Sequence, residues 1–122
     1  MGDAMDPRLN LLCQAGLIDE DIGIGMNLVI DRLAHFWRLP VDSLQGEMAI
    51  THMANALMRT RRGEQINGMD AALLTEIMQS ADILYIQKIN QDVLAYFDQK
   101  PDQNEMGYLL SNIYSLYLAS RQ

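Results

Sequence analysis

The sequence is poor in metal-binding and redox-active side chains, with a single cysteine, Cys13, and two histidines, His35 and His52. One cysteine cannot form a disulfide within the chain, and this usage is typical of a reducing compartment. The Cys-x-x-Cys, His-Glu-x-x-His and calcium-loop spacings are absent, so a metal site would need scattered carboxylates. We therefore expect no metal and no cofactor, and we interpret Cys13 as a small buried apolar residue.

Basic residues and long apolar runs are also scarce. Nine Lys and Arg stand against sixteen Asp and Glu, which gives a formal net charge of −7. Nucleic-acid binding depends on cations that neutralise phosphates, so this balance argues against direct binding of DNA or RNA. No stretch is long and apolar enough for a membrane span, and the first residues do not resemble a signal peptide. The sequence predicts a cytoplasmic protein.

No motif typical of a catalytic centre is present. Gly23 and Gly25 do not follow a strand pattern, and the rest of a dinucleotide-binding fingerprint is missing, so we expect them to permit close helix packing. Ser43, His52 and Cys13 do not have the spacing of a nucleophile and its base. We therefore do not expect an enzyme.

Hydrophobic residues make up 49% of the chain, and many of them recur at helical spacing. Helices are expected from 19–21 to the break at 38–40, from Asp42 as cap to about 62, and over about 70–79, 82–97 and 104–119. No segment alternates like a strand. The sequence thus predicts an all-α compact bundle of about five helices over residues 19–122, preceded by an N-terminal extension, 1–18, with a short docked helix.

The expected core and a possible subunit interface follow from the same periodicity. The helix that begins near residue 19 is apolar on two faces, and Ile24, Leu28 and Leu39 lie beside His35 on the second face. We interpret His35 as packed or interfacial. The residues predicted to be buried in the core are Ile50, Met53, Leu57, Ile86, Ile89, Val93, Leu109 and Ile113.

His52 lies on the polar side of its helix, opposite the apolar stripe and together with Met48, Asn55 and Arg59. Arg59 follows seven residues later, about 10.5 Å along the axis, and a helical side chain leans back toward the N-terminus. An anionic group on His52 would therefore find a cation nearby. Ordinary solvated side chains on an exposed face would produce the same pattern.

Two segments resemble the PTS regulation domain, abbreviated PRD. Residues 51–59, THMANALMR, resemble the first conserved-histidine segment of that family, in which an arginine follows the histidine by seven positions. Residues 104–113, NEMGYLLSNI, resemble the second segment, where an acidic pair, a glycine, an aromatic residue and an apolar pair precede a histidine. Asn112 occupies that histidine position, 60 residues after His52, as in the spacing of the family. The resemblance covers about residues 19–119.

The resemblance implies a regulatory module that is phosphorylated on histidine by HPr or another component of the bacterial phosphotransferase system. His52 would be the phosphoryl acceptor, with Arg59 as stabilising cation and Asn55 as a hydrogen-bonding neighbour. Asn112 would be a degenerate second phosphorylation position, because an amide is not a phosphoryl acceptor of this kind. Such modules usually act by changing dimer packing, so a homodimer is also implied.

The resemblance further implies a small stand-alone PRD protein, because 122 residues leave no room for an RNA-binding, helix-turn-helix or phosphotransferase domain. We expect it to act on transcription or metabolism through a partner. The alternative is an interaction bundle that has kept the fold and lost the switch. Asn112 favours this alternative, whereas His52 and Arg59 favour phosphorylation.

Overall fold

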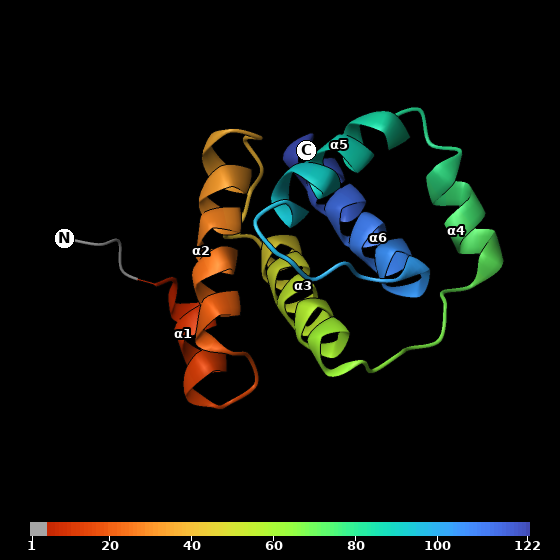
Figure 1. Cartoon of the computed structure of the whole chain (residues 1–122). Coiled ribbons are helices and arrows are strands. Elements are labelled where there is room, and N and C mark those ends of the chain that lie inside the picture. The colour runs from red at the N-terminus through yellow and green to blue at the C-terminus, as the bar shows by residue number, and fades with distance from the viewer. Residues whose placement is uncertain (1–4) are drawn as a thin grey trace.

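A computed structural model describes residues 5–122, which form six α-helices connected by turns and short linkers (Figure 1). In chain order the helices are α1 (Pro7–Gln14), α2 (Glu20–His35), α3 (Leu44–Arg62), α4 (Ala71–Met78), α5 (Ile83–Leu94) and α6 (Gln103–Ser120). The predicted all-α bundle is confirmed for this part of the chain. The short helix expected in the N-terminal extension is α1, which packs against α2.

The core is built around α6, which lies between α3 and the pair α4 and α5 (Figure 1). On its other side α3 packs against α2. All eight residues predicted to form the core are buried, namely Ile50, Met53, Leu57, Ile86, Ile89, Val93, Leu109 and Ile113. The helical periodicity therefore identified the inward faces of α3, α5 and α6 correctly.

The ends of α3 follow from its sequence, although the predicted cap is off by one residue. The Ser43 hydroxyl accepts a hydrogen bond from the Gly46 amide at 3.1 Å and caps the helix. Asp42, the predicted cap, instead has an exposed carboxylate 3.5 Å from the Arg8 guanidinium. At the other end Gly63 adopts a φ of 71°, which glycine tolerates without steric cost. This helix presents His52 and Arg59.

The two glycines of α2 are sites of close packing, as predicted. A Cβ at Gly23 would lie 2.7 Å from the sulfur of Cys13, and one at Gly25 would overlap the ring of Phe97. Cys13 is half-buried rather than fully buried, and desolvation raises the pKa of its thiol. Phe97 was expected inside a helix, but α5 ends at Leu94, because the Phe97 amide bonds the carbonyl three residues back. The resulting turn brings the ring to α2.

The second apolar face of α2 is only partly covered. Ile24 and Leu28 are 53% and 48% exposed. Leu39, predicted on this side, is buried instead: Arg38 has a φ of 59°, which turns the chain back so that the Leu39 amide bonds the Leu33 carbonyl at 2.9 Å. In residues 5–122 we find no helix with the length and apolar character needed to cross a bilayer.

Candidate functional site

His52 and Arg59 on α3 share one site with Asn112 on α6, because these two helices are antiparallel neighbours (Figure 1). His52 and Arg59 are seven residues apart on α3, and Glu105 and Asn112 are seven residues apart on α6. Seven residues rise by about 10.5 Å in either helix. Arg59 therefore faces Glu105 at one level, while His52 and Asn112 share the next level.

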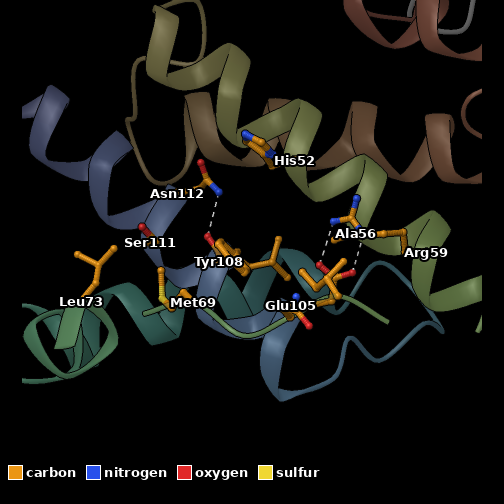
Figure 2. Close-up of a pocket in the computed structure, with 12 residues that line it drawn as sticks. His52, Ala56, Arg59, Met69, Leu73, Glu105, Tyr108, Ser111 and Asn112 are labelled. Atoms are coloured by element: carbon orange, nitrogen blue, oxygen red, sulfur yellow. Dashed lines mark hydrogen bonds and ion pairs between the residues drawn. The ribbon is translucent and has the colours of Figure 1, made fainter. Parts of the chain in front are cut away.

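These four residues line one pocket of about 630 Å³. Its remaining walls come from α3, α6, the linker 63–70 and α4 (Figure 2). The further lining residues are Ala56, Ile66, Asn67, Met69, Leu73, Tyr108, Leu109 and Ser111. The pocket thus combines apolar walls with several polar side chains that could orient a ligand, as binding sites do. His52 is exposed, so another protein can reach its imidazole.

The ion pair between Arg59 and Glu105 dominates the electrostatics of the pocket. The Arg59 Nε and Nη2 groups donate to the two Glu105 carboxylate oxygens at 2.8 and 3.0 Å. The Glu105 side chain is only 2% exposed, whereas that of Arg59 is 30% exposed. The hydrogen bonds to Glu105 raise the pKa of the Arg59 guanidinium above its ordinary value. Arg59 is therefore cationic and held in place by a buried carboxylate.

Asn112 is tied to its own helix. Its Nδ2 donates to the Tyr108 carbonyl at 2.9 Å (Figure 2). No donor within residues 5–122 bonds its Oδ1. Because an amide nitrogen has no lone pair available for attack on phosphorus, this position can contribute hydrogen bonds to a group in the pocket, but it cannot carry a phosphoryl group as a histidine does.

Two sequence-predicted residues lie outside this arrangement. Asn55 is half-buried on α3 but does not line the pocket. His35 lies near the end of α2, where its side chain is 79% exposed and its Nε2 is 3.6 Å from Asp31. The interpretation of His35 as packed is wrong for the single chain, because no element of the described residues covers the outer face of α2 at this point.

Sequence reasoning missed the role of Glu105. An acidic residue in the first turn of a helix is expected for capping and dipole reasons, and Asp102 does cap α6 by accepting from the Glu105 amide at 2.9 Å. The informative signal is the matched seven-residue spacing of His52 and Arg59 on α3 and of Glu105 and Asn112 on α6. This signal becomes useful only once the two helices are known to be antiparallel neighbours.

Chemically, the pocket contains one side chain that can act as a nucleophile, His52, and one cation, Arg59. Of its lining side chains, Arg59 and Glu105 form the ion pair. Within the described chain, no three His, Cys, Asp or Glu side chains gather to form a metal-binding group. The arrangement fits the reception of an anionic group on His52.

Comparison with known proteins finds similar chains in two bacteria. The sequence is 48% identical over 118 residues to the uncharacterized protein YhfY of Escherichia coli, covering 97% of this chain and 98% of that protein. It is 32% identical over 92 residues to an uncharacterized protein of Haemophilus influenzae, covering 75% of this chain and 74% of that one. No family model and no solved structure matches the chain. The PRD resemblance together with the short chain implies a protein of the YhfY type, which the first similarity confirms. Membership of the PRD family stays a prediction.

Proposed function

This chain belongs to the family of the Escherichia coli protein YhfY, and we propose that it is a PRD-like regulatory protein whose His52 accepts a phosphoryl group from HPr or another component of the phosphotransferase system. One observation carries the proposal: the two PRD-like segments contribute to a single pocket. His52 and Arg59 come from the first segment and Asn112 from the second (Figure 2). Two segments that are distant in the sequence thus lie side by side at one site.

The exposed imidazole of His52 suits the chemistry of the transfer. The lone pair of its unprotonated ring nitrogen forms the new N–P bond, while the N–P bond of the donor phosphohistidine breaks and its electron pair returns to the donor ring. The reaction needs no cofactor. The phosphoryl group adds a charge of about −1.5 to −2, and Arg59 is the cation that lines the same pocket. The altered pocket would then be recognised by a partner that acts on transcription or metabolism.

The proposal predicts the labelling pattern with phosphoenolpyruvate, enzyme I and HPr, followed by mass measurement of the intact chain. Wild type should gain one phosphoryl group, and His52→Ala should gain none. His35→Ala is the matched control and should be labelled like wild type, because the His35 side chain lies on α2 outside the pocket. Arg59→Ala should be labelled more slowly or lose its label faster.

Two results would overturn this assignment. If wild type stays unlabelled under conditions that label a control PRD, the protein is not a target of this phosphotransfer. If His52→Ala is still labelled while His35→Ala is not, His35 is the acceptor.

A non-phosphorylated interaction module is the second candidate function. The observation that favours it is the bidentate ion pair, since Arg59 is already bonded to Glu105, together with the amide at Asn112. In this function the pocket would receive a side chain of a partner protein. The labelling assay decides between the two functions.

We also expect a homodimer that uses the outer face of α2. Ile24 and Leu28 are about half exposed there, and a second copy would bury them. Sedimentation at tens of micromolar should show a dimer, and Leu28→Glu should dissociate it. Leu84→Glu is the control, because Leu84 is equally apolar and 75% exposed but lies on α5. A monomeric wild type would contradict the expectation.

A further inference from the structure

The pocket contains one permanent cation for two anions once His52 is phosphorylated. Arg59 is the only arginine or lysine among its lining residues, and it already neutralises Glu105. A phosphoryl group carries up to about twice the charge of a carboxylate and offers three acceptor oxygens. Because His52 is exposed, its phosphoryl group would lie on the solvent side of the pocket. The Arg59 guanidinium is partly exposed and can turn toward that side. The phosphoryl group is therefore the stronger competitor for Arg59.

Loss of Arg59 would leave Glu105 in an unfavourable position. Its carboxylate is 2% exposed and, in residues 5–122, accepts side-chain hydrogen bonds from Arg59 alone. A buried carboxylate without a partner must take up a proton or move to water. The positive end of the α6 dipole offsets only part of this cost. Movement of Glu105 to water requires the first turn of α6 to rearrange.

The first turn of α6 also holds the linker and α4 in place. The Asn104 Nδ2 donates to the Ile66 carbonyl at 3.0 Å. One turn later, α6 has Gly107, and a Cβ there would lie 3.5 Å from the Met69 sulfur and 3.6 Å from a Leu74 methyl. A change at the start of α6 therefore reaches Ile66 and Met69 in the linker and Leu74 in α4.

Little else anchors α4. Ile77 is its one buried residue, and Figure 1 shows the helix at the edge of the bundle, on the side of α6 away from α3. Helices with few buried apolar contacts open at low free-energy cost. A small loss of contact with α6 is therefore enough to release this helix.

On the basis of the proposed function, we propose that Arg59 exchanges Glu105 for the phosphoryl group on His52, and that the freed Glu105 loosens the first turn of α6 and releases the linker and α4. Phosphorylation then changes the surface formed by the linker and α4, residues 64–78, and does not merely add a charge. The ion pair is the element that distinguishes the two states.

Hydrogen exchange measured by mass spectrometry tests the proposal. The protein carries His35→Gln, so that phosphoramidate, a small phosphoryl donor for histidines, modifies His52 alone. Phosphorylation should speed amide exchange in peptides covering 64–78 and 103–108 by about tenfold or more, the order expected when charge-assisted hydrogen bonds are lost. Exchange in α2 should stay unchanged, which shows that the bundle remains folded.

Two further variants isolate the ion pair. Unphosphorylated Arg59→Gln should already exchange rapidly in 64–78, because Glu105 has lost its cation. Glu105→Gln leaves no buried charge behind, so phosphorylation should change its exchange by less than about twofold. The proposal is overturned if the phosphorylated His35→Gln protein exchanges like its unmodified form, if Glu105→Gln in the same background responds as strongly, or if phosphoramidate does not modify His52. Failure of HPr alone to label His52 would refute only the proposed function, because phosphoramidate needs no protein donor.

Discussion

Leu57→Ala should lower the free energy of unfolding by about 2–5 kcal/mol. Leu57 is fully buried on α3, in the core that α3 shares with α2 and α6. Removal of its isobutyl group loses the transfer free energy of the buried carbons and leaves a cavity that the surrounding helices can only partly close. Urea unfolding followed by circular dichroism measures the change, provided that the slope with denaturant is unaltered.

Leu44→Ala is the matched control for this prediction. It makes the same chemical change on the same helix, but Leu44 is 70% exposed, so its effect should stay within about 0.5 kcal/mol. A loss below about 0.5 kcal/mol for Leu57→Ala would show that the inward face of α3 has been assigned wrongly.

Arg59→Ala should destabilise the protein by about 3 kcal/mol, the lower end of the range for removing one partner of a buried ion pair. The lower end applies because the Arg59 side chain is 30% exposed, whereas that of Glu105 is 2% exposed. The cost arises mainly from the carboxylate that is left behind without its two hydrogen bonds. Glu105→Gln should cost less, about 1–2 kcal/mol, because a neutral amide can still accept from Arg59.

The double variant Arg59→Ala/Glu105→Gln should be more stable than Arg59→Ala alone, since no buried charge then lacks a partner. Arg61→Ala controls for the loss of an arginine nearby: Arg61 bonds Asp19 and Asp21 at the exposed surface, and its removal should matter far less. Equal effects of Arg59→Ala and Arg61→Ala would mean that Glu105 is not electrostatically dependent on Arg59. Urea unfolding of the four variants provides the measurement.

Helix positions and inward faces were predictable because they depend on local spacing. Apolar residues every three or four positions mark the buried side of α3, α5 and α6, and caps such as Asp70 mark where a helix begins. The errors occur where the chain leaves the helix. The left-handed backbone at Arg38 turns Leu39 into the core, and a tighter turn ends α5 at Leu94, which periodicity alone does not encode.

The candidate site was predictable only in part for a related reason. His52 and Arg59 share one helix, so their common face follows from 100° per residue. The partner of Arg59 lies on another helix, and periodicity says nothing about which helices are neighbours. Glu105 could equally have been a solvated first-turn residue of α6, and its burial is a property of the packed bundle.

The sequence by itself determined an acidic, all-helical chain in which His52 and Arg59 point the same way, because composition and helical period are local properties. The tertiary structure alone decided that Arg59 is bound to Glu105, that Asn112 shares the pocket of His52, and that Leu73 of α4 lines the same pocket. Those relations depend on the antiparallel packing of α3 against α6, which brings Arg59 and Glu105, 46 residues apart in the chain, into contact. The free energy of the charge on Glu105 is set by its burial and by the opposite charge of Arg59, and both result from the packing of α6 against α3.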